Sequence, residues 1–248
     1  MSTEVVLYEE ESGVAVITLN RPERRNALNT PLTDALMAAF ERARDAETVR
    51  AVVLTGAGKG FCAGADLADS FSATFTPEQG AAYIKEKYGP LMGLIASIPK
   101  PVIGAINGAA AGAGAALALA CDLRVMAEDA YVLYAFVNIG LGPDAGAGWF
   151  LARQVGYSRA FELATSGAKI SAQKCQELGL TNRIAPASDL LSNATAWAQQ
   201  YAKGPTVAYG ITKDDLNFAI DNPLQDTIER EADNQMSGST IRLGCGRR

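Results

Sequence analysis

Twenty consecutive residues without a charged side chain, PVIGAINGAAAGAGAALALA at 101–120, limit the folds open to this chain. A membrane helix of about 20 apolar residues is one interpretation, and Gly108 and Gly112 have the G-x-x-x-G spacing found in such helices. Much of the segment, however, is Ala and Gly rather than Leu, Ile and Phe, Asn107 lies inside it, and no basic flank marks a cytoplasmic side. These features favour a buried strand, a turn and a buried helix, and no membrane contact is expected.

Short apolar strands alternate with helices along the chain. The expected strands are residues 4–10, 14–19, 50–56, 101–107, 123–128 and 131–136, and the expected helices are 30–45, 77–98 and 112–120. Ser12 and Gly13 form the turn between the first two strands. Asn29 or Thr30 caps the first helix. From residue 147 onward the pattern is mostly helical, so the sequence predicts an α/β core followed by a helical C-terminal region.

The composition excludes several classes of function. A net charge of −5 leaves no basic footprint for nucleic acid, and no nucleic-acid partner is expected. The N-terminus lacks the basic and apolar regions of a secretory signal. The four cysteines are far apart and form no C-x-x-C pair, so we expect free thiols and a cytoplasmic location.

The chain contains no histidine. This excludes Ser-His-Asp and Cys-His catalysis and removes the commonest metal ligand, so no metal site is expected. Any acid–base chemistry must therefore use a carboxylate, Lys, Tyr or Cys.

One carboxylate has unusual surroundings. Asp144 lies in GLGPDAGAGW, residues 140–149, between two largely apolar stretches. A carboxylate in an apolar pocket is a stronger base than one in water, because desolvation raises its pKa. Two other interpretations are an N-cap for a helix that begins near Ala147 and a G-x-G-x-x-A dinucleotide fingerprint. Pro143 weakens the second, because it lacks the N–H that would help to bind a pyrophosphate.

Two glycine-rich segments, GKGFCAGADL and NGAAAGAGAALALA, each follow a buried strand and lead into an expected helix. Small residues let a ligand approach the backbone closely, and the unpaired N–H groups at the start of a helix favour negative charge. The segments could together form an oxyanion hole from main-chain N–H groups. The alternative is that they are only tight strand–helix packings, and local composition leaves both interpretations open.

Four segments resemble the signature blocks of the crotonase family, the enoyl-CoA hydratase/isomerase superfamily. They are NRPERRNALN, GKGFCAGADL, KPVIGAINGAAAGAGAALALACDLRV and IGLGPDAGAGWFLARQVG, in the family's order and spacing. The resemblance covers about residues 3–234 and implies the α/β crotonase fold, a spiral of ββα units. It places the core and active site in residues 1–190 and a helical region for trimerisation in residues 191–248, whose end, QMSGSTIRLGCGRR, departs from the pattern.

The family acts on acyl-CoA thioesters and stabilises a thioester enolate with two backbone N–H groups. By position, these groups resemble those of Ala65 and Ala113. The CoA moiety would lie along Arg24, Arg25, Ala27, Ala63, Asp66 and Leu67. The resemblance therefore implies an acyl-CoA substrate that carries its own coenzyme A, no separate cofactor, and a homotrimer or a dimer of trimers.

Departures from the family pattern bear on the reaction. Hydratases of the family use two glutamates to handle the water, and their positions here look like Ala116 and Phe136, which cannot hold or deprotonate it. Some isomerases of the family place their acid in a G-L-x-P-D/E loop, which GLGPD resembles. Asp144 then looks like the single acid–base residue. The substrate pocket would include Ala116, Phe136 and Trp149.

The sequence therefore predicts an acyl-CoA isomerase that converts 3-enoyl-CoA to 2-enoyl-CoA. A ring-expanding 1,2-epoxyphenylacetyl-CoA isomerase fits the same loop. Two alternatives belong to other classes: a protein that binds acyl-CoA without turnover, and a dinucleotide-dependent oxidoreductase.

Overall fold

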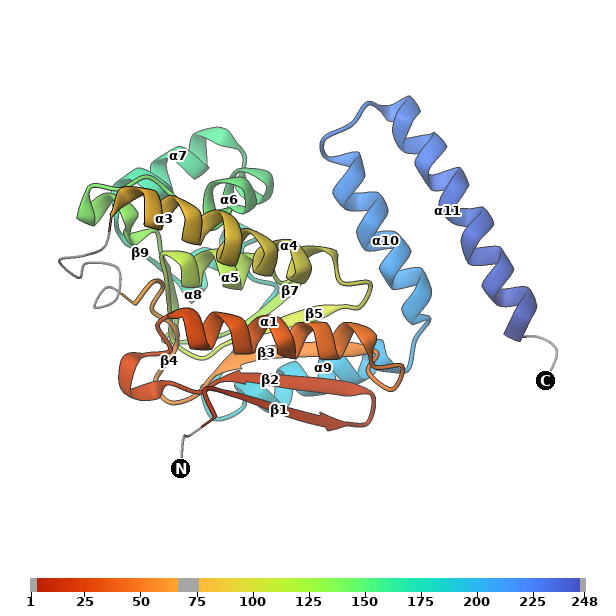
Figure 1. Ribbon diagram of the computed structural model, residues 1–248, viewed down its shortest axis with the longest axis horizontal. Helices are drawn as coiled ribbons and strands as arrows, with labels where there is room; N and C mark the ends of the chain where they lie inside the picture. Colours follow the sequence, from red (N-terminus) through yellow and green to blue (C-terminus); the bar gives the residue numbers. More distant parts are fainter. Residues whose placement is uncertain (1–3, 67–75, 246–248) are drawn as a thin grey trace.

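The computed structural model describes residues 4–66 and 76–245, with side chains as far as Met236. Among these residues, six strands form the larger of two sheets, in the order β1-β2-β3-β5-β7-β10 (Figure 1). They are β1 (Val6–Glu11), β2 (Val14–Leu19), β3 (Ala51–Gly56), β5 (Val102–Ile106), β7 (Leu123–Ala127) and β10 (Arg183–Ala185). β1 pairs antiparallel with β2, and the other neighbours are parallel. β3 and β5 are buried throughout, as expected for parallel strands covered on both faces.

Local sequence signals account for the first hairpin and the first helix. Ser12 and Gly13 have φ angles of 53° and 80°, as the two central residues of a type I′ turn require. Asn29 is the N-cap of α1 (Thr30–Asp45), and its side chain accepts a hydrogen bond from the N–H of Leu32 (3.1 Å). Both predictions are confirmed.

A second, smaller sheet was not predicted. Among the described residues it joins β4 (Gly60–Cys62), β6 (Ala109–Ala111), β8 (Tyr131–Leu133) and β9 (Lys169–Ser171) in that order. The successive strand pairs β3–β4, β5–β6 and β7–β8 each place one strand in each sheet, so the chain advances as a spiral. The predicted α/β spiral of ββα units is confirmed, but the strand predicted at 131–136 ends at Leu133, because the chain then enters the 3-10 helix η3 (Ala135–Ile139).

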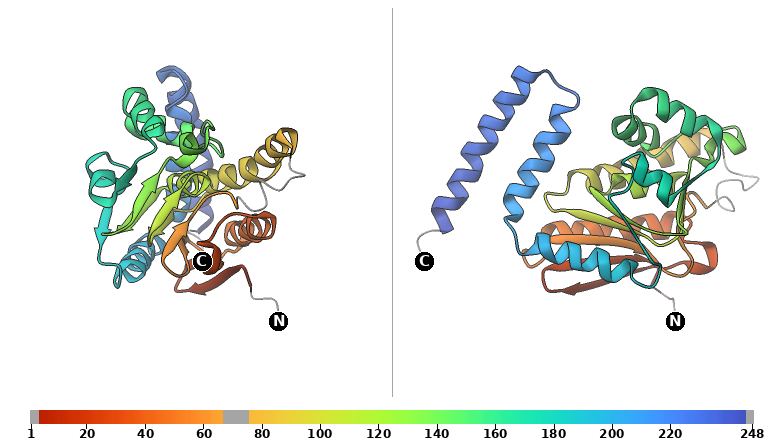
Figure 2. Two further views of the ribbon diagram at one scale, coloured as in Figure 1. Left: turned by 90° about the vertical axis from the view of Figure 1, so that its left-hand side faces the viewer. Right: turned by 180° about the vertical axis from the view of Figure 1, so that it is seen from behind.

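Helices cover both faces of the larger sheet. α1, α3 (Pro77–Tyr83) and α4 (Gly89–Ser97) lie on one side, and α9 (Leu190–Ala202) lies on the other (Figures 1 and 2). The remaining helical elements are η1 (Pro22–Arg24), η2 (Ile84–Tyr88), α5 (Ala113–Ala120), α6 (Ala147–Val155), α7 (Tyr157–Ser166), α8 (Ala172–Glu177), α10 (Thr206–Ala219) and α11 (Leu224–Cys245).

The charge-free segment 101–120 forms the predicted buried strand, β5, and the predicted buried helix, α5, with the strand β6 between them where only a turn was predicted. None of the described helices is both long enough and apolar enough to cross a membrane.

The C-terminal region has two parts. α9 packs on β3, β5 and β7 through buried residues such as Ala194 and Ala198. α10 and α11 run side by side, with α11 on the far side of α10 from the core (Figures 1 and 2). The domain boundary at residue 190 stays a prediction.

Gly114 lies in α5 where the helix approaches β4. A Cβ at this position would lie 2.8 Å from the carbonyl carbon of Cys62 and would overlap its oxygen. Alanine is normally the better helix former by about 1 kcal/mol. We nevertheless expect Gly114→Ala to lower the free energy of unfolding by about 1–3 kcal/mol, because α5 must shift away from β4. Urea unfolding measures this effect.

Gly93 in α4 provides the matched control. A Cβ there meets no atom within 4 Å. Gly93→Ala should therefore raise the free energy of unfolding by about 0.5–1 kcal/mol. Equal effects of the two substitutions would contradict the close approach of α5 to β4.

Candidate active site

Backbone hydrogen bonds join the two segments predicted to bind CoA. The N–H of Ala63 donates to the carbonyl oxygen of Arg25 (3.0 Å), and that of Leu28 donates to Gly64 (2.7 Å). The carbonyl oxygen of Leu28 accepts the N–H of Asp66 (3.0 Å). The segments therefore lie side by side and bring together the predicted CoA residues Arg24, Arg25, Ala27, Ala63 and Asp66; Leu67 lies outside the described residues.

Asn26 holds the first segment in shape, although nothing in the sequence singled it out. It is fully buried, and its φ of 55° is in the left-handed region that asparagine tolerates. Its Nδ2 donates to the carbonyl oxygens of Gly60 (2.8 Å) and Phe61 (3.1 Å). The neighbouring Arg24 and Arg25 are exposed, so their charges are accessible to an anion.

Arg21 is a second residue that the sequence reasoning missed. Its guanidinium donates to the carbonyl oxygen of Ala27 (2.6 Å) and forms an ion pair with Asp66 (3.1 Å). The protein itself thus engages the Asp66 carboxylate, and a contact of Asp66 with CoA stays a prediction.

The N–H groups of Ala65 and Ala113 belong to two backbone segments that approach each other at Gly64. Ala113 is the first residue of α5, so its N–H has no acceptor inside the helix. Leu28 and Ala65 form an isolated parallel β-bridge, whose hydrogen bonds use the N–H groups of Leu28 and Asp66. The N–H of Ala65 therefore points away from Leu28. Gly64 has a φ of 91°, and a Cβ there would lie 3.3 Å from the nitrogen of Ala113. The absence of a side chain at residue 64 allows the two segments to approach, which is the arrangement that an oxyanion hole needs.

The Asp144 carboxylate is partly buried, and its Oδ1 atom is buried with no hydrogen-bond partner among the described residues. Burial raises the pKa of Asp144 to about 6, because the charged form loses water without gaining a partner. A carboxylate with a pKa in this range can both accept and return a proton near neutral pH.

The structure excludes the N-cap interpretation of Asp144. α6 begins at Ala147 with Gly146 as its N-cap, and no side chain caps it. The main-chain oxygen of Asp144 accepts the N–H of Ala147 (2.8 Å). Ala145 has a φ of 52°, a left-handed conformation that costs a non-glycine residue about 1–3 kcal/mol. This strained turn leaves the carboxylate free of the helix end.

Phe136 and Ala116 are both buried. A Cβ at Gly112 would lie 3.9 Å from the Phe136 ring, so this ring lies beside the residue that precedes Ala113. The hydroxyl of Tyr134 donates to the carbonyl oxygen of Ala147 (3.1 Å) and ties this segment to α6. Neither Phe136 nor Ala116 offers an acceptor that could orient a water.

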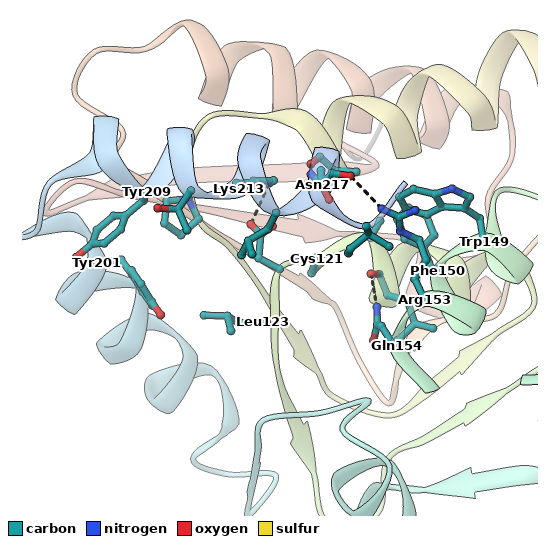
Figure 3. Close-up of a pocket in the computed structure, with 18 residues that line it drawn as sticks. Cys121, Leu123, Trp149, Phe150, Arg153, Gln154, Tyr201, Tyr209, Lys213 and Asn217 are labelled. Carbon is teal, nitrogen blue, oxygen red and sulfur yellow. Dashed lines mark hydrogen bonds and ion pairs between the residues drawn. The ribbon is translucent and has the colours of Figure 1, made fainter. Parts of the chain in front are cut away.

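Trp149 lies at a different place. It is 47% exposed, and the Arg153 guanidinium lies 3.9 Å from its ring centroid. With Phe150 it lines one end of a cavity of about 400 Å³ between α6 and α10 (Figure 3). The same cavity reaches Cys121, which follows the C-terminal end of α5. Ala113 lies at the N-terminal end of that helix, so the cavity and Ala113 are at opposite ends of α5. The place of Trp149 in a substrate pocket stays a prediction.

The thiols near the site are poor candidates for acid–base chemistry. Burial raises the pKa of Cys62, at the end of β4, to about 12, so it stays protonated at neutral pH. Within the part of the chain that the structure describes, no group of three or more Cys, Asp and Glu side chains could hold a metal ion.

Comparison with known proteins agrees with this geometry. The family model for enoyl-CoA hydratase/isomerase matches residues 9–242. The chain belongs to the enoyl-CoA hydratase/isomerase family. The predicted resemblance to the crotonases is thereby confirmed.

Individual members of the enoyl-CoA hydratase/isomerase family are similar over nearly the whole chain. A protein of Rhodobacter capsulatus named probable enoyl-CoA hydratase is 43% identical over 94% of this chain and 88% of its own. The 1,2-epoxyphenylacetyl-CoA isomerase of Escherichia coli is 39% identical over 94% of this chain and 89% of its own. The crystal structure of an enoyl-CoA hydratase from Polaromonas has a TM-score of 0.87 at 37% identity and covers 98% of this chain and 97% of its own.

Asp144→Asn should stabilise this enoyl-CoA hydratase/isomerase family member at about pH 8. The pKa of Asp144 is higher in the folded than in the unfolded chain, so the folded state binds more protons and stability falls as the pH rises from about 4 to about 6. Removing the charge relieves this cost. Because the carboxylate is partly exposed to solvent, we expect the substitution to raise the free energy of unfolding by only about 1 kcal/mol, or Tm by about 2–4 °C.

Thermal unfolding at two pH values tests the origin of this gain. It should nearly disappear at about pH 4, where Asp144 is protonated in the folded protein and largely so in the unfolded chain. The exposed Asp129 provides the control, and Asp129→Asn should change stability by less than about 0.5 kcal/mol. A gain for Asp144→Asn that is equal at both pH values would contradict the buried-charge explanation.

Proposed function

We propose that this protein is an acyl-CoA isomerase that moves the double bond of a 3-enoyl-CoA to the 2-position, with Asp144 as acid and base. The observation that carries the proposal is the Asp144 carboxylate, whose buried Oδ1 has no hydrogen-bond partner among the described residues and whose pKa is about 6. The relatives named for CoA thioesters support the choice of substrate. Coenzyme A arrives as part of the substrate, and the proton transfer needs no separate cofactor.

One carboxylate is enough for this isomerisation. Ionised Asp144 removes a proton from C2, and the electron pair moves onto the thioester oxygen as an enolate. The N–H groups of Ala65 and Ala113 donate to that oxygen, and the positive end of the α5 dipole adds to the stabilisation. Protonated Asp144 then returns the proton at C4, which leaves the double bond between C2 and C3. No atom is gained or lost.

Hydration makes a different demand on the site. A water must be oriented and deprotonated, and two groups usually share that work. Buried Phe136 and Ala116 offer no acceptor, and Phe136 adds apolar volume beside the hole. Isomerisation therefore suits these side chains better than hydration.

The surroundings of the site support the remaining parts of the proposal. Exposed Arg24 and Arg25 suit the phosphates of CoA. Large apolar side chains are exposed on the outer helices, at Leu216, Ile220 and Leu224, and a homotrimer or dimer of trimers would cover them. We propose the cytoplasm as the location, in keeping with cysteines that are free among the described residues.

Ring-expanding isomerisation of 1,2-epoxyphenylacetyl-CoA is the second candidate. The 39% identity to the Escherichia coli isomerase of that name favours it, and the same base and oxyanion hole would serve. Rates with the epoxide and with a 3-enoyl-CoA, measured on one preparation, distinguish the two.

Asp144→Asn should lower kcat for a 3-enoyl-CoA about 10²–10⁴-fold and leave thioester binding nearly intact. In the unsubstituted protein, kcat/KM should fall below about pH 6, because protonated Asp144 cannot accept the C2 proton. The absorbance of the conjugated 2-enoyl thioester follows the reaction. Wild-type turnover in the variant, or a flat profile across pH 6, would be incompatible with Asp144 as the base.

Crotonyl-CoA hydration should be slow or undetectable, because Ala116 and Phe136 replace the two water-handling carboxylates. Loss of enoyl-thioester absorbance measures it, beside the isomerase assay as a control for active protein. Hydration at an ordinary turnover of about 10 s⁻¹ would overturn the isomerase proposal.

A further inference from the structure

The surrounding backbone must set the position of the Asp144 carboxylate, because its buried Oδ1 atom has no hydrogen-bond partner among the described residues. The next residue, Ala145, has a left-handed φ of 52°. A strained turn of this kind persists only where the surrounding structure fixes it. The groups that hold the turn therefore also determine where the carboxylate lies.

The main chain beside Tyr134 is bonded to the start of α5. Leu133, the last residue of β8, pairs with Ala111 in β6, and its carbonyl oxygen accepts the N–H of Gly112 (2.9 Å). Gly112 is the N-cap of α5 and directly precedes Ala113. Tyr134 thus follows a residue that is bonded to the backbone carrying the Ala113 N–H.

The Tyr134 side chain reaches the other half of the candidate site. Its hydroxyl donates to the carbonyl oxygen of Ala147 (3.1 Å), and the N–H of Ala147 donates in turn to the main-chain oxygen of Asp144 (2.8 Å). Tyr134 is fully buried, and burial raises its pKa, so the phenol stays neutral and keeps its O–H as a donor. Two hydrogen bonds in series therefore connect Tyr134 to the turn that carries the Asp144 carboxylate.

We propose that Tyr134 is a positioning residue, whose hydroxyl holds the turn of Asp144 at a fixed place relative to the N–H of Ala113. The inference rests on the proposed function, which assigns the base to Asp144 and the enolate oxygen to Ala65 and Ala113. The Tyr134 hydroxyl is bonded to Ala147, so it acts through the backbone and not as an acid. Proton transfer requires the carboxylate to lie close to C2, and a displacement of about 1 Å can lower the rate about 10²-fold.

Tyr134→Phe tests this role, because it removes the donor and keeps the buried ring. The Ala147 carbonyl retains a partner, since an α-helix bonds residue 147 to the N–H of residue 151. With a 3-enoyl-CoA, kcat should fall about 10–100-fold and KM should change less than about threefold, because thioester binding does not depend on the position of the base. The acid limb of kcat/KM should move from about pH 6 toward about pH 4, because a released turn lets water reach the carboxylate.

Thr181→Val is the matched control. Thr181 lies between α8 and β10 and is 3% exposed, and its hydroxyl donates to the carbonyl oxygen of Arg124 (3.0 Å). That oxygen also accepts the N–H of Asn182 (3.1 Å), so both substitutions remove one buried hydroxyl bond and leave the main-chain acceptor with another donor. Thr181→Val should keep the wild-type kcat and pH profile. Thermal unfolding confirms that each variant is native.

A double-substitution cycle tests the positioning without any turnover. At about pH 8, Asp144→Asn should stabilise Tyr134→Phe less than it stabilises the wild type, because the released carboxylate regains water and its charge costs less. In Thr181→Val the gain should equal that in the wild type. Differences in Tm measure all three gains.

Four outcomes would overturn the role of Tyr134: wild-type kcat in Tyr134→Phe, a higher KM with kcat unchanged, an equal loss of kcat in Thr181→Val, or additive stabilities in the cycle. Asp144→Asn separates this inference from the proposed function. Wild-type turnover in Asp144→Asn refutes the proposed function, and the cycle still reports whether Tyr134 holds the turn. Lost turnover in Asp144→Asn with additive stabilities refutes the role of Tyr134 alone.

Discussion

The contact between the first turn of α5 and the main chain at the end of β4 holds the candidate active site together. β4 and β6 pair in parallel, Gly60 with Ala109 and Cys62 with Ala110, so two successive ββα units end beside each other. Gly64 and Gly114 then allow backbone to approach backbone where any side chain would collide. This backbone packing positions the N–H groups of Ala65 and Ala113, and no side chain is needed to hold them.

Asp144 shows why a functional group can be costly for the fold. Its buried oxygen lacks a partner among the described residues, and the next residue has a strained backbone. The absence of a partner destabilises the charged form, and for the same reason gives the carboxylate a pKa near neutral pH. The large core, with β3, β5 and α5 fully buried, provides the stability that offsets this local cost.

Features that depend on local sequence could be predicted. The hairpin at Ser12-Gly13, the cap at Asn29 and the buried segments 51–56 and 113–120 each follow from turn chemistry or apolar pattern. The three-residue strands β4, β6 and β9 could not be predicted, because their pairing depends on distant partners and they are too short for a pattern.

The candidate site likewise contains residues that the sequence predicts and residues that it does not. Ala65, Ala113 and Asp144 follow from family blocks, and the structure now supplies their surroundings. Asn26 and Arg21 were missed because their partners, such as Ala57 and Asp66, lie 31 and 45 residues away. A hydrogen bond to a distant main-chain carbonyl leaves no pattern in the sequence.

Main-chain and side-chain groups have separate tasks in this site. The proposed oxyanion hole would consist of N–H groups alone, so that Ala113 would serve as well as a glycine, and the sheet contacts that position it need not change when the reaction changes. Asp144 and Phe136, by contrast, come from the turn before α6 and from η3. Neither lies in β4 or β6, whose pairing positions the two N–H groups. A main-chain hole with independent side chains around it would explain how proteins named probable enoyl-CoA hydratase and 1,2-epoxyphenylacetyl-CoA isomerase can both be similar to one chain.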